Sequence, residues 1–375
     1  MKSIRLITLL FIVSTTMAFS LEKLFLDVFA PRPGEVVTVM HDLPHDDIQD
    51  NQEWQDRRHM AEDWHKQIAA FSRMYGISVN PIVTYKATGS HNANMPENGM
   101  WKGQQTRLED IIRGSTIIIS MPEFSASAPL IGFVKQYVNL RAASLPTVRR
   151  SMEETALSAD YKKVAATCAR LAPLFEGSDG IEVIFSTGHA CHFDISDHKR
   201  VLQDTGSLPP GTRFYMERFA NLPAGEVAVC PNEKENSQTE GEIPAVIDGE
   251  MVVFVVKANQ IVRITGDGPI AERKRGEFNT ERALRHIAEV AIGCNDRAVV
   301  TGNVLEDEKA GFHWAYGRSD FLGGTVGVDN FTSPEKAYHK DIVYAKGNPV
   351  VCKRLDFISP NGTRTTAVID GALIV

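Results

Sequence analysis

Five acidic and imidazole residues in the second half of the chain lie in unusually apolar surroundings. They are Glu226 in PAGEVAV, Glu289 in HIAEVAIG, His313 in GFHWAYG, and His339 and Asp341 in YHKDIVY. Because side chains alternate along a strand, residues two apart share a face, so His339 and Asp341 can bind one ion together. Carboxylate and imidazole groups suit zinc, cobalt, manganese or iron(II), and five of them fit two ions that share a bridging carboxylate.

Each of these residues also has a structural interpretation. A glutamate flanked by valine and alanine is often a charge at a strand edge, and a histidine before tryptophan is often a hydrogen-bonded core residue. The spacings of 63, 24, 26 and 2 residues along the chain are too long for a local metal motif such as H-E-x-x-H. The spacing alone therefore leaves the metal site open.

A second cluster of polar groups lies in STGHACHFDISDHK, which holds His189, Cys191, His192, Asp194 and His198. His189 or His192 could supply an acid or a base near the metals, or the segment could be a ligand set of its own. The alternation of His192, Asp194 and Ser196 also fits the polar face of a strand whose other face carries Phe193 and Ile195. We favour this structural interpretation.

The composition narrows the class of protein. A length of 375 residues suggests two or three domains, and 43% hydrophobic with 23% charged residues is typical of globular chains. A net charge of -7, with no long basic run, argues against nucleic-acid binding. Five widely spaced cysteines without C-x-x-C predict reduced thiols rather than a disulfide framework or a zinc knuckle.

Residues 1–20 resemble a short secretory signal. Two basic residues precede an apolar run over 6–13, which is too short to span a bilayer. In the competing interpretation the start site is mis-assigned and Met17 is the initiator, because the folded pattern begins directly after it. The odd cysteine count favours this second interpretation, so we expect a cytoplasmic protein, with export as the alternative.

The first half of the chain alternates apolar strands with amphipathic helices. We predict helices after Ser20, before Gly76 and at 161–175, a further helix whose end lies at 108–112, and strands at 36–40, 77–85 and 116–121. Apolar strands between helices indicate a parallel sheet covered on both faces. No G-x-G-x-x-G or P-loop follows the first strand, so no nucleotide site is expected. The polar segment 86–102 could lie over a site as a loop.

The second half of the chain is predicted to be mainly β. Short apolar runs alternate with turn residues from Ile181 onward, including GEVAV, AVIDGEMVVFVV, AVVTG, TVGV and DIVYAKG. One helix is expected to interrupt them, from an N-cap at Thr280 through Ile287.

Longer stretches resemble a known family. The segment IAEVAIGCNDRAVVTGNVLEDEKAGFHWAYGRSDFLGGTVG, followed by YHKDIVY, resembles the carboxy-terminal signature of the aminopeptidase T family of dinuclear metallo-aminopeptidases. NLPAGEVAVCPNEKENSQTEG is similar to that family's other metal-binding segment, and SLEKLFLDVFAPRPGEVVTV to its opening. The resemblance covers 20–375 in outline and is specific over 221–344. It implies a possible homodimer and five metal ligands, with Glu289 as the bridge: Glu226, Glu289, His313, His339 and Asp341.

One position departs from the family pattern. Family members usually carry a tyrosine seven residues after the histidine of FHWAYG, and here that residue is Asp320. Tyr316 could occupy nearby space. A further group must orient the histidines, and Asp320 and Glu308 are candidates by their position in the sequence. Under the hydrolase hypothesis, Asp320 therefore joins Glu226 and Glu289 as a predicted catalytic residue.

A second activity is suggested by another resemblance. The sequence is similar to iron(II) dioxygenases that open dihydroxypyridine rings, at the histidine of FHWAYG, at H-x-D and at Pro231-Asn232-Glu233. This likeness implies one iron(II) held by His313, His339 and Asp341. Because Glu226 and Glu289 are both present, we favour the two-metal hydrolase. A metal-stabilised binding protein without chemistry is a third alternative.

The combined prediction is an α/β protein. Residues 21–180 would form a Rossmann-like parallel-sheet domain and 181–375 a β-rich α+β domain that carries the metals, with 1–20 a leader or a mis-assigned start. The expected activity is hydrolysis of a small peptide or amide with two zinc, cobalt or manganese ions. Iron(II) ring cleavage is the alternative. No nucleic acid and no membrane span is expected.

Overall fold

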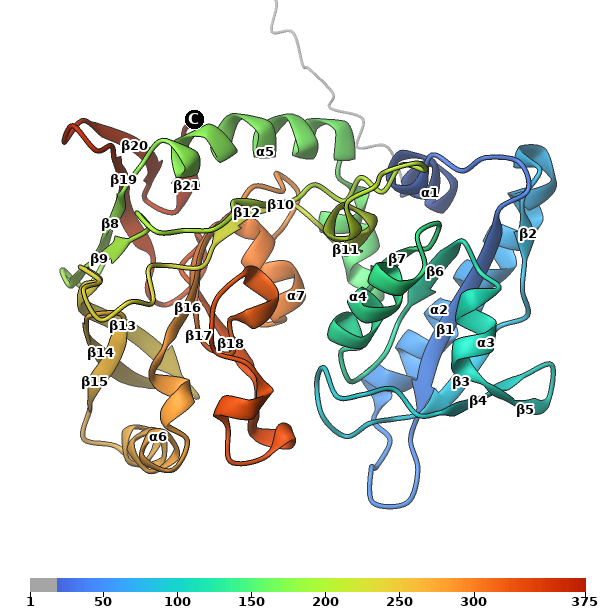
Figure 1. The fold of residues 1–375 in the computed structure, drawn as a ribbon, viewed down its shortest axis with the longest axis horizontal. Coiled ribbons are helices and arrows are strands. Elements are labelled where there is room, and N and C mark those ends of the chain that lie inside the picture. Colours follow the sequence, from blue (N-terminus) through green and yellow to red (C-terminus); the bar gives the residue numbers. More distant parts are fainter. Residues whose placement is uncertain (1–18) are drawn as a thin grey trace, which may run out of the picture.

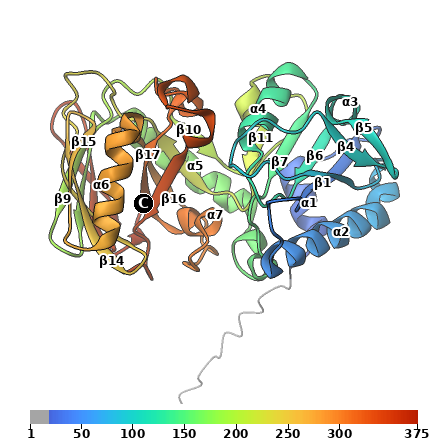
Figure 2. The same ribbon diagram turned by 90° about the horizontal axis from the view of Figure 1, so that it is seen from below.

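The computed structural model describes residues 19–375, and the signal-like pattern predicted for residues 1–20 lies almost entirely outside the described residues. Two lobes stand side by side (Figure 1), and a view turned by 90° shows the same division (Figure 2). The first lobe is built on one mixed sheet, and the second lobe on two antiparallel sheets. The α/β fold with a β-rich second lobe is thus confirmed.

The first lobe has a mostly parallel sheet with the strand order β11-β7-β6-β1-β3-β4-β5, and β2 pairs with β1. The strands are β1 (Val36–Leu43), β2 (Ser78–Val79), β3 (Val83–Lys86), β4 (Asn98–Trp101), β5 (Gln104–Arg107), β6 (Ile117–Ser120), β7 (Arg141–Ser144) and β11 (Phe219–Asn221). The helices are α1 (Leu21–Phe29), α2 (Gln52–Ser72), α3 (Leu108–Arg113) and α4 (Ser127–Gln136).

Both faces of this sheet are buried. Ile117 and Ile119 point into a core shared with α1 and α2, whereas Ile118 points into a second core with α3 and α4. The helices begin where the sequence provides caps, since Ser20 accepts a hydrogen bond from the Lys23 amide and Asn51 from the Trp54 amide. The predicted covered parallel sheet is confirmed from β11 through β3.

Several first-lobe elements differ from the predictions. The strand expected at 77–85 is two short strands, because Pro81 lies between β2 and β3 and lacks an amide hydrogen for the ladder. The antiparallel hairpin of β4 and β5 was not expected, nor were α4 and β7. The residues of α3 form a complete short helix rather than the end of a longer one.

The second lobe pairs a five-stranded sheet, β10-β12-β16-β17-β18, with an eight-stranded sheet, β15-β14-β13-β9-β8-β19-β20-β21. The smaller sheet contains β10 (Leu202–Asp204), β12 (Glu226–Val229), β16 (Ile287–Gly293), β17 (Phe312–Gly317) and β18 (His339–Val343). The larger contains β8 (Gly180–Phe185), β9 (Ala190–Asp194), β13 (Glu240–Ile247), β14 (Glu250–Lys257), β15 (Gln260–Thr265), β19 (Cys352–Ile358), β20 (Arg364–Ile369) and β21 (Ala372–Leu373).

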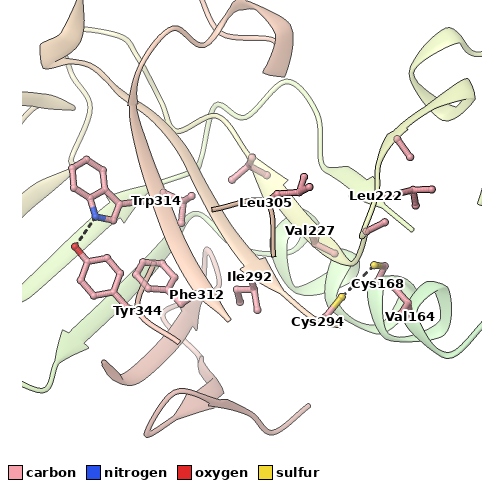
Figure 3. Close-up of a cluster of buried hydrophobic side chains, with 14 of the residues drawn as sticks. Val164, Cys168, Leu222, Val227, Ile292, Cys294, Leu305, Phe312, Trp314 and Tyr344 are labelled. Atoms are coloured by element: carbon pink, nitrogen blue, oxygen red, sulfur yellow. Dashed lines mark hydrogen bonds between the residues drawn. The ribbon is translucent and has the colours of Figure 1, made fainter. Parts of the chain in front are cut away.

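Aromatic side chains fill the space between these two sheets. Phe312 packs near Phe185 and Phe193, and Trp314 meets Phe254 edge to face. The Trp314 indole N–H donates to the Tyr344 hydroxyl at 2.9 Å (Figure 3). One face of β17 therefore packs into the core. Its other face, which carries His313, points away from the core.

The helices of the second half include one correction. The helix expected from Thr280 through Ile287 is wrong: α6 spans Pro269–Thr280, so Thr280 ends it. Pro269 stands at its first turn, where the missing amide hydrogen costs nothing. A 3-10 turn at Arg282–Arg285 then leads into β16. The runs AVVTG and TVGV, expected as strands, form no strand in the structure.

Two segments connect the lobes. Helix α5 (Tyr161–Glu176), as predicted, runs along the top of the second lobe and contacts α1 at the first lobe (Figure 1). Strand β11 comes after residue 180 in the chain, yet it pairs in parallel with β7 of the first lobe. A short helix, α7 (Val304–Asp307), completes the fold. Within residues 19–375, no helix is long and apolar enough to cross a membrane.

Candidate metal centre

The strand register places all five predicted ligands on one face of the five-stranded sheet. The opposed pairs are Glu226 with Gly293, Ala291 with His313, Glu289 with Ala315, Ala315 with Asp341, and Gly317 with His339. Opposed residues in an antiparallel pair share a face, and so do residues two apart on a strand. Four strands thus deliver Glu226, Glu289, His313, His339 and Asp341 to a single surface.

Small residues make room on that surface. Ala291, Gly293, Ala315 and Gly317 share the face with the five ligands and take up little space between them. A Cβ at Gly293 would overlap the carbonyl oxygen of Glu308. Glycine at this position therefore allows the segment before β17 to cross close over the sheet.

Three of the groups form one candidate metal-binding triad. His339 Nε2 lies 2.8 Å from Glu289 Oε2 and 3.2 Å from Asp341 Oδ1. The other ring nitrogen, Nδ1, lies 2.7 Å from the Arg318 carbonyl oxygen. Nδ1 donates to that carbonyl, and Nε2 faces the carboxylates, to which it donates until a cation takes the place of its proton.

The second triad shares Glu289 with the first. His313 Nε2 lies 3.4 Å from Glu226 Oε2 and 3.9 Å from Glu289 Oε1, and its Nδ1 lies 3.2 Å from the Gly311 carbonyl oxygen. Glu289 thus directs one oxygen toward His313 and the other toward His339. This is the arrangement expected of a carboxylate that bridges two ions.

A buried lysine supports the Glu226 side. The Lys309 side chain is fully buried, and its Nζ lies 2.6 Å from Glu226 Oε1, 2.8 Å from Glu308 Oε1 and 3.7 Å from Asp204 Oδ2. Burial lowers the pKa of Lys309, but the three carboxylates outweigh it and hold that pKa well above its usual value. Lys309 was not predicted from the sequence, although it directly follows the acidic run LEDE and stands four residues before His313.

The donor set fits divalent cations. Within residues 19–375, Glu226 Oε2 is buried and has no hydrogen-bond partner, although it points toward His313. Burial raises the pKa of Glu226, but Lys309 and His313 lower it to about 2, so this carboxylate stays charged. A buried, charged oxygen that accepts no hydrogen bond is stabilised by a nearby cation. The described residues offer two such triads, Glu226-Glu289-His313 and Glu289-His339-Asp341.

The triads open into a large cavity between the lobes. It has a volume of about 690 Å³, and its lining includes all five predicted ligands together with Glu308. The opposite wall comes from the first lobe and from β11, with Asn92, Ser127 and Asn221. Asn221 Oδ1 accepts a hydrogen bond from Ser127 Oγ at 2.9 Å. A reactive bond at the triads would thus face hydroxyl and amide groups across the cavity.

Part of the segment 86–102 reaches this cavity. Its residues 89–92 belong to the lining, and His91 Nδ1 accepts a hydrogen bond from the Ser125 amide at 3.0 Å. His91 is one of several histidines scattered through the first half of the sequence. Nothing in its local sequence separated it from His59 or His65, because its position depends on how the two lobes meet.

The other predicted site residues lie elsewhere. Asp320 bonds Arg318, with Oδ1 at 2.6 Å from Nε, and among the described residues it is not part of the cavity lining. Tyr316 lies on the opposite, core-facing side of β17, where its hydroxyl accepts from Lys274 Nζ at 3.1 Å. The groups that orient the two histidines are the backbone carbonyls of Gly311 and Arg318, rather than Asp320 or Glu308.

The cluster around His192 has a structural role in β9 and the turn that follows. Asp194 is buried and accepts hydrogen bonds from Ser196, Asn232 and the Gln238 amide. Phe193 and Ile195 point into the core as expected. Among the described residues the cavity lining contains none of His189, His192 or His198.

Comparison with known proteins places the fold. No protein-family model and no curated protein matches the sequence. Wild-type AmpT from Thermus thermophilus matches with a TM-score of 0.56 and 14% identity over 95% of this chain and 99% of its own. The 2,5-dihydroxypyridine dioxygenase from Pseudomonas putida KT2440 matches with a TM-score of 0.62 and 15% identity over 94% of this chain and 96% of its own.

Both resemblances found in the sequence are therefore confirmed as likenesses of fold. At 14% and 15% identity, the likeness shows a shared fold and does not extend to activity. The chain combines the fold of AmpT and of the dioxygenase with two candidate metal-binding triads that share Glu289.

Proposed function

We propose that this protein is a metal-dependent hydrolase that cleaves an amide or peptide bond in a small substrate. Glu226 and His313 would hold one divalent cation, His339 and Asp341 the other, and Glu289 both. The observation that carries this proposal is the position of Glu289, which directs one carboxylate oxygen toward each histidine. If the site held a single ion, Glu289 would need to direct an oxygen toward only one of the two histidines.

When bound, two divalent cations supply Lewis acidity for a carbonyl oxygen and lower the pKa of a water. The protein groups do the rest. His313 and His339 keep their protons on Nδ1, held by the carbonyls of Gly311 and Arg318. Lys309 holds Glu226 by one oxygen and leaves the other free for a ligand role.

Glu308 is the carboxyl group suited to carry a proton at this site. It lines the cavity beside the triads, and its Oε1 bonds Lys309. Burial raises the pKa of Glu308 to about 8 against the opposing charge of Lys309. A carboxyl group that titrates near neutral pH can accept a proton from water and return it to a leaving amine.

An iron(II) ring-cleaving dioxygenase is the second candidate, favoured by the likeness of fold to the Pseudomonas putida enzyme. Its iron would need His313, His339 and Asp341 around one position. Each of the two triads among the described residues contains only one histidine, and His313 groups with Glu226 rather than with Asp341. The grouping therefore supports the hydrolase.

We also propose that the chain divides into functional units at 21–180 and 181–375, with β11 returning to the first. Near residue 180 the chain leaves α5 and enters β8 of the second lobe. The second unit would carry the metals and the first would cover the substrate.

Metal analysis with two assays separates the alternatives. Protein purified without chelator or added metal is analysed for moles of each metal per chain, and is then assayed with aminoacyl anilides and for oxygen uptake with dihydroxypyridines. We expect nearly two equivalents of zinc, cobalt or manganese and turnover of an anilide. One equivalent of iron with oxygen uptake would establish the dioxygenase instead, and bound metal without any turnover would favour a binding protein.

A further inference from the structure

Two buried thiols from distant parts of the chain meet beside the metal-binding sheet. Cys168 lies in the middle of α5 and Cys294 directly follows β16, and their sulfur atoms are 3.3 Å apart (Figure 3). Cys168 is fully buried and Cys294 is 9% exposed. We infer that Cys168 and Cys294 form a disulfide bond when the protein meets a small two-electron oxidant.

The geometry selects this pair from the five cysteines. All five are free thiols, and among residues 19–375 no other two thiols are in hydrogen-bonding contact. A disulfide holds its sulfur atoms about 2.05 Å apart, so these two must approach by only about 1.2 Å. That movement is small enough for side-chain rotation and slight backbone adjustment. Sequence spacing could not reveal the pair, because 126 positions separate its members.

The surroundings of the pair are tight and mostly apolar. Val164 and Val227 lie beside it in the buried cluster (Figure 3). The Cys168 thiol also contacts the backbone carbonyl oxygens of Glu226 at 3.7 Å and Asp204 at 3.9 Å. Cys294 is the more exposed of the two thiols, so an oxidant reaches it first.

The oxidation balances with diamide as the oxidant. The Cys294 thiol loses its proton and its sulfur adds to one nitrogen of the N=N bond. The Cys168 sulfur then attacks Cys294, the S–N bond breaks, and the S–S bond forms. The two thiols together give up two protons and two electrons, and the diazene becomes a hydrazine with two new N–H bonds.

The crosslink would join α5 to the end of β16 and close a loop across most of the second half of the chain. Closing a long loop restricts the unfolded chain more than the folded one, so the oxidised protein should resist unfolding. This consequence does not depend on the proposed hydrolase activity. The disulfide could form whatever the site binds.

The test treats the full-length protein with diamide, blocks remaining thiols with N-ethylmaleimide after unfolding, and maps the peptides without reduction. We expect one crosslinked pair, which joins the peptides of Cys168 and Cys294 at 2 Da below their summed mass. We also expect a higher urea midpoint that dithiothreitol reverses. Cys168→Ser and, separately, Cys294→Ser should abolish the crosslink and the shift in midpoint.

Cys352→Ser serves as the matched control, since Cys352 is equally buried in β19 but touches no other thiol among the described residues. This variant should still form the crosslink. Full alkylation of both Cys168 and Cys294 after diamide would overturn the inference, as would a crosslink of either residue to a different cysteine.

Discussion

The two candidate triads share Glu289 but are held in different ways. On the Glu226 side, a fully buried ammonium group binds the ligand carboxylate, with two further carboxylates around it. On the His339 side, no lysine or arginine of the described residues pairs with Asp341, which bonds His339 two residues away on the same strand. The half-site around Glu226 therefore depends on the fixed charge of Lys309. The half-site around His339 depends on the geometry of β18 and on one backbone carbonyl.

The two half-sites therefore form under different conditions. The carboxylates around Lys309 are buried, so the Lys309 ammonium must balance their negative charge before any cation binds. The His339 half-site is already set by β18, whose alternation puts His339 and Asp341 on one face.

Removing the shared carboxylate should have the largest effect. We expect Glu289→Gln to bind at most one metal per chain and to lose more than about 100-fold in turnover, since even groups behind the ligands are worth about 10- to 100-fold. Metal analysis and anilide hydrolysis measure both quantities. Glu235→Gln, on the loop after β12, is the control. Two bound metals with full turnover in Glu289→Gln would contradict the proposal that Glu289 bridges the two cations.

Removing the buried ammonium should destabilise only the Glu226 side. We expect Lys309→Met to lower the free energy of unfolding of the metal-free protein by about 3–5 kcal/mol, because Glu226, Glu308 and Asp204 lose their shared partner. Zinc should restore more stability to this variant than to the unmodified protein, because a cation then replaces the missing charge. Urea unfolding with and without zinc measures this effect.

Lys353→Met is the control for this substitution. Lys353 is 64% exposed and lies 4.0 Å from Asp370, so its loss should change stability by less than about 0.5 kcal/mol. An equal, small effect of both substitutions would show that the charge of Lys309 is not needed to compensate its neighbours.

The pH should act on the metal-free protein and on metal binding in opposite directions. Burial lowers the pKa of His313, but the nearby carboxylates of Glu226, Glu289 and Asp341 outweigh it and raise the folded-state pKa to about 9. A raised pKa stabilises the fold fully below the unfolded value of about 6.5 and loses that effect as the pH rises through 9. Metal affinity should rise over the same range, because a ligand histidine must lose its proton.

Urea unfolding of chelated protein and zinc titrations between pH 6 and 9.5 measure these two trends. We expect the stability of the metal-free protein to fall by about 1–3 kcal/mol across this range. In His313→Asn the fall should be clearly smaller. Zinc affinity that is unchanged across the range would contradict a protonated His313 in the metal-free site.

The substitution Asp320→Asn should have the smallest effect. Asp320 is 38% exposed and pairs with Arg318, so we expect turnover to change by less than about threefold and stability by less than about 0.5 kcal/mol. Steady-state kinetics and urea unfolding check both. A loss above about 100-fold would instead give Asp320 the catalytic role that its place in the sequence suggested.

Much of the site could be predicted from residue types, but not its geometry. The alternation rule placed His339 and Asp341 together because they lie on one strand. The convergence with Glu226, Glu289 and His313 depends on the register of four strands, which no spacing along the chain encodes. Lys309 was missed for a related reason, since its contacts with Asp204 and Glu226 join positions 83 to 105 residues apart.

The fold was predictable where local patterns were strong. The capped helices α1, α2 and α5 and the apolar strand β6 lie where periodicity indicated them. The prediction failed at α6, because a helix was expected to begin at Thr280 and continue through Ile287, whereas α6 ends at Thr280 and Ile287 already belongs to β16. It also missed β11, whose three residues are a strand only because β7 offers an open edge.

The return of β11 to the first lobe ties the two walls of the cavity together. Asn221 ends β11 on one wall, and Glu226 begins β12 on the other. Five residue steps of fully extended chain span at most about 18 Å, so these two Cα atoms cannot move farther apart while both strands stay paired. If the cavity opens, the two lobes must therefore rotate about the short connection between Asn221 and Glu226. The cavity walls far from this connection must then separate more than the walls beside Glu226.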